Sequence, residues 1–244
     1  MNAQLLGGEG WHNANIARRT GEVRRGGSWK NQRTIVILPS SDLIPAKVAL
    51  SHWCLAFPPN QGVHRMLALG TEVGEAYTSA IEAILAEPTL SKWEFILTIE
   101  HDNMPPFDGV VRLIEQMEKH PEFHCISGLY WCKGPGGPPH IWGDIKDPVV
   151  NFRPQPPDPN GGLVECYGTS MGFAIWRLPF FKDPRLHRPW FKTYNGTEGR
   201  GIGTQDLAFA SDARKYGFRC AVDCSVLVGH YDHAGLFGEK EFVW

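Results

Sequence analysis

The chain has 244 residues, which is long enough for one large α/β domain or two small ones with a substantial core, and we expect one domain with a tail. A hydrophobic fraction of 42%, a charged fraction of 20% and a formal net charge of −2 exclude a whole-molecule attraction to nucleic acid or to anionic membranes. The sequence has neither a long apolar run nor the apolar core of a signal peptide, so we expect a cytoplasmic protein without a transmembrane segment.

Residues 1–33 are rich in Gly, Asn and Arg and show neither helical nor strand periodicity. They predict a mobile basic tail, either a solvated extension or an electrostatic contact with a phosphate-bearing partner. The next run, TIVILPSSD at residues 34–42, is rich in β-branched residues and is interrupted by Pro39. This pattern predicts a first strand that is buried on both faces.

Alternating strand and helix patterns follow. Residues 72–86 carry apolar side chains at helical spacing, and Pro88 ends this predicted helix. Residues 93–100, WEFILTIE, predict a second buried strand. Residues 105–119 begin with two prolines and continue with apolar residues at helical spacing, and residues 124–131 predict another strand. The succession of strand, helix, strand and helix predicts a parallel sheet.

Gly and Pro dominate the next part of the chain, at residues 133–144 and 152–162. Such stretches form neither helix nor central strand, and loops of this length in a compact domain usually serve a site. The remaining pattern predicts two strands, a helix closed by Gly217 and a final strand region, at residues 163–168, 171–178, 204–217 and 218–230. We therefore predict an α/β fold with one mixed, mainly parallel sheet flanked by helices.

The second buried strand ends abruptly in Glu100, His101 and Asp102. Ligands of open α/β sheets bind beyond the carboxyl ends of the strands, so these side chains lie where a ligand would. Mg²⁺ or Mn²⁺ commonly uses few protein ligands while a phosphate supplies the rest, and two nearby carboxylates suit such a cation. His230, at the end of the last strand region, is a second candidate ligand. A polar loop and a structural histidine are the alternatives.

The six cysteines contain no CxxC pair and stand in apolar surroundings. They predict buried, reduced thiols that pack as small hydrophobic side chains. A structural zinc site at Cys220 and Cys224 is the alternative, although the spacing is poor and no second pair is evident.

The order of the segments TIVILPSSD, FILTIEHDNMPPFDGVVRLIEQ, GTSMGFAIWRLPFF, GTQDLAFASDARKYGF and VGHYDH resembles a GT-A fold glycosyltransferase. In style it is similar to the large inverting family of processive and non-processive synthases. The resemblance covers residues 34–233 and implies a single GT-A-like domain at residues 34–244. It divides this domain into a nucleotide-binding half, residues 34–130, and an acceptor half, residues 131–244. It also implies transfer of a sugar from a UDP- or GDP-sugar to a hydroxyl of a glycan or another acceptor.

The resemblance assigns roles to particular residues. The family's acid-x-acid motif, which binds Mn²⁺ or Mg²⁺ on the nucleotide diphosphate, falls on Glu100, His101 and Asp102. A late histidine that helps to hold the metal or the diphosphate falls on His230. The acidic motif whose last carboxylate acts as the base falls on TQD and hence on Asp206. If the enzyme instead retains the anomeric configuration, Asp206 would bind the acceptor.

This sequence departs from the family pattern in three places. Glu100 stands where the family usually has Asp, which makes Asp102 the safer metal ligand. Gln205 stands where the family often has Glu. Tyr77 and Thr78 replace the usual Arg and Asn of the helix, so the nucleotide contacts expected there are in doubt.

Further contacts are expected at the end of the first strand and near the acceptor. Candidate nucleotide contacts are Pro39, Ser40 and Ser41, together with Glu100 and His101. Aromatic faces stack against sugar rings, which makes three aromatic residues candidate acceptor contacts: Trp131, Trp190 and Tyr194. Residues 187–206 combine aromatic residues with four glycines and predict a lid on the acceptor side, with an ordinary surface loop as the alternative.

Two other classes of function stay open. GTSMG at residues 168–172 matches the G-x-S-x-G nucleophile motif, and Ser170, Asp206 and His230 follow in the chain order of an α/β-hydrolase. However, the residues after Ser170 favour a strand rather than the required helix, and no HGG segment precedes them. A non-catalytic module that binds a nucleotide or a glycan is the third class, suggested by Glu100 and Gln205.

Overall fold

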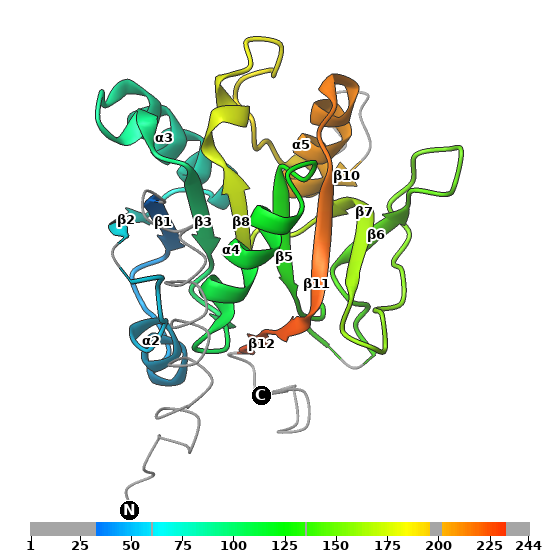
Figure 1. The fold of residues 1–244 in the computed structure, drawn as a ribbon, viewed down its shortest axis with the longest axis horizontal. Coiled ribbons are helices and arrows are strands. Elements are labelled where there is room, and N and C mark those ends of the chain that lie inside the picture. Colours follow the sequence, from blue (N-terminus) through cyan, green and yellow to red (C-terminus); the bar gives the residue numbers. More distant parts are fainter. Residues whose placement is uncertain (1–32, 60, 135, 196–201, 233–244) are drawn as a thin grey trace, which may run out of the picture.

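The computed structural model describes residues 33–59, 61–134, 136–195 and 202–232. These residues form one eight-stranded sheet with helices on both faces, and two small two-stranded ladders (Figure 1). The strands are β1 Arg33–Ser40, β2 Gly62–Leu69, β3 Phe95–Ile99, β4 Asn103–Met104, β5 Cys125–Leu129, β6 Ile141–Asp144, β7 Leu163–Thr169, β8 Phe173–Arg177, β9 Tyr194–Asn195, β10 Ile202–Gly203, β11 Cys220–Leu227 and β12 Gly229–His230. The predicted basic tail lies outside the described residues except for Arg33.

Within the described residues, four α-helices and three short 3₁₀ helices connect the strands. The helices are α2 Ala46–Trp53, α3 Val73–Ala86, α4 Gly109–Lys119 and α5 Gln205–Ala213, and the 3₁₀ segments are Leu90–Lys92, Leu178–Lys182 and Arg214–Tyr216. The end of the last predicted helix follows the expectation, because Gly217 adopts the left-handed conformation with φ of 91° after the third 3₁₀ segment. No helix among the described residues is long and apolar enough to cross a membrane.

The strand order of the large sheet is β2-β1-β3-β8-β5-β11-β7-β6. β1 is parallel to β2 and β3, and β5 is parallel to β11. β8 lies antiparallel between β3 and β5, and β7 lies antiparallel between β11 and β6. β7 and β8 thus run against the other six strands. The α/β class and the mixed sheet predicted from the sequence are confirmed.

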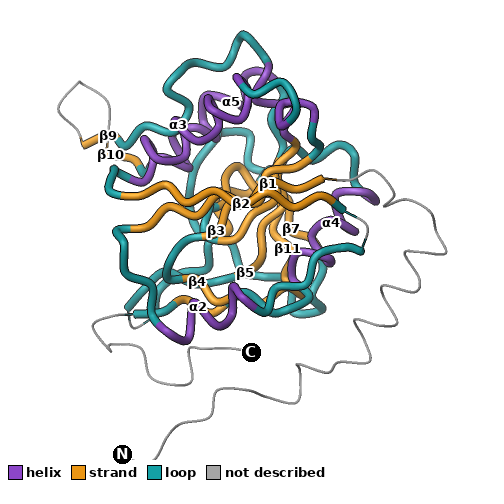
Figure 2. The backbone as a smooth tube through the Cα atoms, turned by 90° about the vertical axis from the view of Figure 1, so that its left-hand side faces the viewer, coloured by secondary structure: helices purple, strands orange, loops and turns teal. Residues whose placement is uncertain are grey.

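Apolar side chains on each face of the sheet meet a different set of helices. Ile35 and Ile37 of β1 belong to the same core cluster as buried residues of α3 and α5. Val36, between them, belongs to the cluster that contains the buried face of α4. This alternation follows from the period of two along a strand, and it explains why a strand covered on both sides has an apolar residue at every position. Figure 2 shows α3 and α5 on one side of the sheet and α4 on the other.

α2 and β2 were not predicted from the sequence. They lie between β1 and α3, where we expected a direct connection from the first strand to the helix at residues 72–86. In the described sheet β2 is an edge strand that pairs with β1, and each of its residues is either half-buried or exposed. The apolar pattern that identifies a buried strand is missing from β2, because the strand contains His64 and Arg65 and exposes Leu67 and Leu69.

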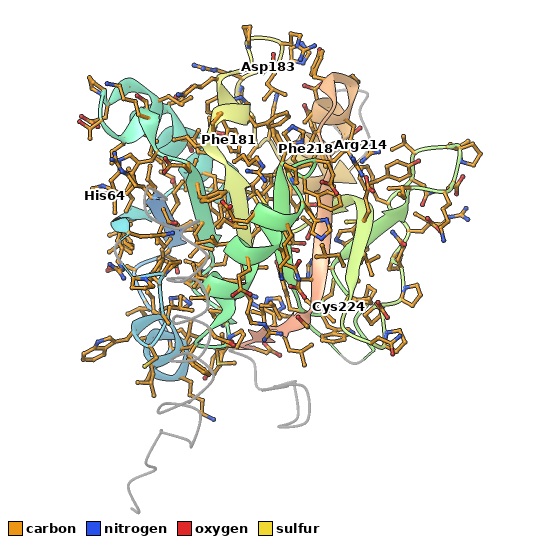
Figure 3. All side chains as sticks on the ribbon, viewed as in Figure 1. His64, Phe181, Asp183, Arg214, Phe218 and Cys224 are labelled. Carbon is orange, nitrogen blue, oxygen red and sulfur yellow. The ribbon has the colours of Figure 1, made fainter. Side chains whose placement is uncertain are left out.

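An aromatic cluster anchors α5 to the sheet. Phe209 of α5 lies 4.7 Å from Phe191 and 5.5 Å from Phe218, measured between ring centroids. Trp176 of β8 lies 5.9 Å from both Phe209 and Phe181. Figure 3 labels Phe181 and Phe218, which lie near the end of the sheet opposite β12. The cluster fixes the helix whose first turn carries Asp206.

Candidate functional site

The candidate site lies at the carboxyl ends of β1 and β3, the lower edge of the sheet in Figure 1, near β12 and α2. All five residues of β3 are buried, and the chain turns as soon as the strand ends, with the amide of Asn103 donating to the carbonyl oxygen of Glu100 at 3.1 Å. This turn leads into β4, which pairs with β12 and sets His230 opposite Asn103. The short ladder therefore brings the Glu100–Asp102 turn next to the last strand region.

Asp102 is buried and contacts two basic side chains. Its Oδ2 atom contacts the ammonium group of Lys133 and lies 3.7 Å from Nε2 of His230. Burial alone would raise the pKa of Asp102, but the contacts with His230 and Lys133 outweigh burial and hold the pKa well below the ordinary value of 3.8. The Oδ1 atom is also buried and has no hydrogen-bond partner among the described residues. Asp102 is therefore a charged carboxylate with one oxygen unused.

The orientation of His230 is fixed by its other nitrogen. Nδ1 of His230 lies 2.8 Å from the carbonyl oxygen of Trp131, and because a carbonyl only accepts, Nδ1 donates. In the neutral ring Nε2 then carries the lone pair, and this atom faces Asp102. A backbone carbonyl that orients an imidazole in this way is the usual support of a metal-binding histidine.

Asp102 and His230 fit the part of a metal site that a protein supplies to a nucleotide-bound cation. Together they offer a carboxylate oxygen and an imidazole nitrogen, and Oδ1 of Asp102 is a second oxygen without a partner. Among the described residues no group of three or more His, Cys, Asp or Glu side chains could hold a metal. Mn²⁺ and Mg²⁺ accept one or two protein ligands when phosphate oxygens complete the coordination, so two ligands suffice for such a site.

Glu100, half-buried at the end of β3, differs from Asp102 in its charge. Burial raises its pKa, and the negative charges of Asp102 and Asp206 raise it further, to about 8. At neutral pH Glu100 is therefore mainly protonated and is a hydrogen-bond donor. Its amide donates to the carbonyl oxygen of Gly172 at 3.0 Å, which ties the turn to the β7–β8 connection. The predicted role of Glu100 as a metal ligand requires loss of this proton.

Asp206 is the second residue of α5 and is buried. Burial raises its pKa, while hydrogen bonds from the hydroxyl groups of Thr204 and Ser170 and from the amide of Leu207 lower it, and the net shift is upward. The amide of Leu207 lies 2.8 Å from Oδ1 of Asp206. Because the charge of Asp206 also acts on Glu100, the carboxylates expected to bind the metal and to act as the base share one region.

A polar chain behind Asp206 was not predicted. Ser170 lies in the turn between β7 and β8, and its hydroxyl contacts both Asp206 and Nδ1 of His140. His140 stacks on Tyr130 with ring centroids 4.4 Å apart. Burial first, and then the neighbouring His230, lower the pKa of His140 to about 3, so the ring is neutral. The sequence signal was weak, because His140 stands in a Gly- and Pro-rich stretch.

The geometry around Ser170 does not match a serine hydrolase. A catalytic triad places the histidine between the serine and the acid. Here Ser170 lies between His140 and Asp206, and His230 donates to the carbonyl oxygen of Trp131. The segment after Ser170 is strand β8 and not the helix that a nucleophile elbow requires.

The end of β1 meets the same edge of the sheet. β1 and β3 are parallel neighbours, so Pro39 and Ser40 lie near Glu100 and His101. The hydroxyl oxygen of Ser40 accepts from the amide of Asp42 at 3.1 Å, and this bond shapes the turn that follows the strand. Ser41 is exposed. The candidate nucleotide contacts at the end of β1 therefore lie near the Glu100–Asp102 turn.

The three candidate acceptor residues lie in different environments. Trp131 is half-buried, and its carbonyl oxygen holds His230, so it borders the site. Trp190 is only 3% exposed and packs 5.5 Å from Phe181, so its ring belongs to the core and offers no free face to a sugar. Tyr194 is half-buried in the β9–β10 ladder. Residues 196–201 of the predicted lid lie outside the described residues.

Lys133 is a charged residue near Asp102 that the sequence analysis missed. It lies in a tight hairpin between β5 and β6, in the first of the two Gly- and Pro-rich stretches. Only the general expectation that long loops serve a site pointed to this segment.

The cysteines follow the expectation of reduced thiols, because all six are free. Sγ of Cys220 lies 3.9 Å from Sγ of Cys166 on the neighbouring strand β7. Cys224 instead accepts a hydrogen bond from the amide of Asp158 at 3.4 Å. The zinc site considered for Cys220 and Cys224 therefore has no support in the described residues.

Comparisons with known proteins identify a similar fold. No protein-family model and no curated protein matches this sequence. Among solved structures, the chain is similar to the crystal structure of A197 from STIV, with a TM-score of 0.57 and 14% sequence identity. The similarity covers 82% of this chain and 86% of that chain. At this identity it shows a shared fold and nothing about activity.

Proposed function

We propose that this protein is a metal-dependent glycosyltransferase with a GT-A-like fold that moves a sugar from a nucleotide-diphosphate donor to an acceptor hydroxyl. The observation that carries the proposal is the approach of Nε2 of His230 to Oδ2 of Asp102, at 3.7 Å, from segments more than 120 residues apart. The pair lies at the carboxyl ends of parallel strands, where ligands of open α/β sheets bind.

The two metal-binding candidates have distinct tasks in this proposal. Asp102 keeps its charge at neutral pH because of the low pKa described above, and Nε2 of His230 would give its lone pair to a metal when the ring is neutral. When bound, Mn²⁺ or Mg²⁺ would neutralise the charge that builds on the departing diphosphate. Pro39, Ser40 and Ser41 would contact the nucleotide in this proposal, because they follow β1 next to the end of β3, and Ser41 is exposed.

Asp206 is the proposed base. Transfer with inversion requires that the acceptor oxygen bond to the anomeric carbon while the bond from that carbon to the diphosphate breaks. The proton of the acceptor hydroxyl then moves to the carboxylate of Asp206. Burial raises the pKa of Asp206, which makes the carboxylate a stronger base, and hydrogen bonds from Ser170 and Thr204 orient it. A positioned base of this kind typically accelerates a reaction by about 10² to 10⁴.

The first test measures nucleotide binding, because neither the donor sugar nor the acceptor is identified. Thermal unfolding is followed with UDP, GDP, CDP or dTDP, each in Mn²⁺ or in EDTA. Binding to the folded state stabilises it by about 2.7 kcal/mol when the ligand exceeds its Kd a hundredfold. We expect one or two of the nucleotides to raise Tm in Mn²⁺ and none to do so in EDTA.

The variant Asp102→Asn tests the site directly, because it removes the charge and keeps the shape. We expect it to lose the Mn²⁺-dependent rise in Tm. The matched control is Asp144→Asn, at the exposed end of the edge strand β6. A nucleotide response that survives in Asp102→Asn removes Asp102 from the site.

Turnover then separates an enzyme from a binding module. If a nucleotide binds, the corresponding nucleotide sugars are incubated with the protein and Mn²⁺, and release of nucleoside diphosphate is measured. We expect slow donor hydrolysis that Asp206→Asn abolishes without weakening nucleotide binding. Binding with no release across a broad donor panel would favour the non-catalytic module.

A further inference from the structure

The inference concerns Lys133 and its hairpin. The amide of His140 donates to the carbonyl oxygen of Tyr130, and the amide of Cys132 donates to that of Pro138, each at 2.9 Å. A Cβ atom at Gly137 would lie 2.1 Å from the carbonyl oxygen of Cys132, so this close approach needs glycine. The hairpin is therefore defined by its backbone, and it carries Lys133 to the site.

Lys133 contacts the carboxylate oxygen that a metal held between Asp102 and His230 would use. Its ammonium group contacts Oδ2 of Asp102, and this same oxygen is the one that faces Nε2 of His230. The side chain of Lys133 is 37% exposed, whereas that of Asp102 is 12% exposed. The carboxylate is thus fixed in the protein, and the ammonium group lies on a long side chain that reaches it from the solvent side.

The charges around Lys133 explain why a cation is needed there. The ammonium group of Lys133 contacts the buried carboxylate of Asp102, and Glu100, half-buried at the end of β3, lies two residues away along the chain. A buried carboxylate is unfavourable without a compensating positive charge, and the ammonium group of Lys133 supplies this charge to Asp102. A divalent cation on Asp102 would provide the same compensation more strongly.

We propose that Lys133 is a resident counter-cation, which a divalent metal displaces from Asp102 and which then contacts the diphosphate of the donor. This inference rests on the function proposed above. A metal ion held between Oδ2 of Asp102 and Nε2 of His230 would occupy the oxygen that Lys133 contacts, and the two positive charges would repel each other, so such a metal would displace Lys133. The arriving diphosphate supplies new acceptor oxygens for an ammonium group within reach.

The proposal predicts opposite effects on two ligands. Lys133→Met removes the competitor for Asp102, so we expect Mn²⁺ alone to bind about two- to tenfold more tightly than to the wild type. The same variant loses a charge-assisted contact with the diphosphate. We therefore expect the Mn²⁺ complex of a nucleoside diphosphate to bind about 10- to 100-fold more weakly. Mn²⁺ binding is measured by the EPR signal of the free ion, and nucleotide binding by calorimetry with UDP, GDP, CDP and dTDP in turn.

Two further variants serve as controls. Lys133→Arg keeps the positive charge, so it should bind Mn²⁺ as weakly as the wild type does. Lys182→Met removes an exposed lysine from the 3₁₀ segment Leu178–Lys182, which begins next to the start of β3 at the opposite end of the sheet, and should change neither affinity. Thermal unfolding of every variant checks that the fold is retained.

Changes in the same direction for the two ligands, or no change in either, overturn the proposal. If Lys133→Met binds Mn²⁺ more tightly while no nucleotide binds the wild type, displacement from Asp102 is supported and the proposed glycosyltransferase function fails. If neither protein binds Mn²⁺, the displacement itself is refuted.

Discussion

The charge state of Glu100 is the residue-scale feature with the clearest consequence for stability. Its pKa in the folded protein is about 8, against an ordinary value of 4.5. Between these values the folded protein holds a proton that the unfolded chain has released. The free energy of unfolding therefore falls as pH rises from about 4.5 to 8, and it levels off above that window.

Replacing Glu100 by Gln removes this pH dependence. We expect Glu100→Gln to gain stability relative to the wild type as pH rises from 5 to 8, by on the order of 1–3 kcal/mol, since one pKa unit corresponds to about 1.4 kcal/mol. The measurement is urea denaturation at several pH values. Glu82→Gln, on the exposed side of α3, is the control and should follow the wild type. If the free energies of unfolding of Glu100→Gln and the wild type change with pH in the same way, the raised pKa of Glu100 is contradicted.

The residues of the site differed in whether their place near the site could be predicted from the sequence. Asp102 and His230 could be predicted because each ends an apolar strand, and strand ends collect at one edge of a parallel sheet. Lys133 and His140 could not, because their hairpin is held by backbone hydrogen bonds and glycines rather than by an apolar period. The prediction that Trp190 contacts the acceptor was wrong, because its ring is buried in the core. The sequence alone does not distinguish an aromatic residue in a lid from one in the core.

At the scale of elements, α5 determines where Asp206 lies. Asp206 stands in the first turn of this helix, and Phe209, one turn later, packs into the aromatic cluster and is 3% exposed. Its ring lies 5.8 Å from Phe181 and 4.7 Å from Phe191. The position of the proposed base therefore depends on a packing contact made elsewhere in the helix.

Phe209→Ala should destabilise the protein by about 3–5 kcal/mol, because truncating a large buried aromatic side chain leaves a cavity. Urea denaturation provides the measurement. Phe209→Leu keeps most of the apolar volume and should lose less. A loss below about 1 kcal/mol in Phe209→Ala would mean that the cluster does not hold α5 in place.

Elements with strong periodicity were the predictable ones. β1, β3, α3 and α4 have apolar residues on one or both faces, and the sequence placed each of them. β2 was not predicted, because an edge strand exposes part of its length and its sequence therefore contains polar residues among the apolar ones. β4 and β12 have only two residues each, too few for any period, yet they join the acidic turn to His230.

At the scale of the whole molecule, the two predicted halves share one sheet. Residues 34–130 supply β1, β2, β3 and β5, and residues 131–244 supply β6, β7, β8 and β11. β8 lies between β3 and β5, so a strand of the second half separates two strands of the first. Neither half can complete its hydrogen bonds without the other.

A fragment of residues 33–150 should therefore not fold alone, because β3 and β5 would each expose an unpaired edge. We expect no cooperative unfolding transition for this fragment by circular dichroism. Mixing it with residues 151–244 should restore a cooperative transition, since the break lies in the exposed loop around Val149 and Val150. A cooperative transition in the first fragment alone would contradict this expectation.

The place of β8 also constrains how the newly made chain matures on the ribosome. β3 is complete at Ile99, but its partner strand β8 ends at Arg177, which is translated 78 residues later. Until then the two central strands of the first half remain open to foreign strands, and slow long-range pairing of this kind favours aggregation. During synthesis, this protein should consequently depend on chaperones that shield strand edges until the second half of the chain has emerged.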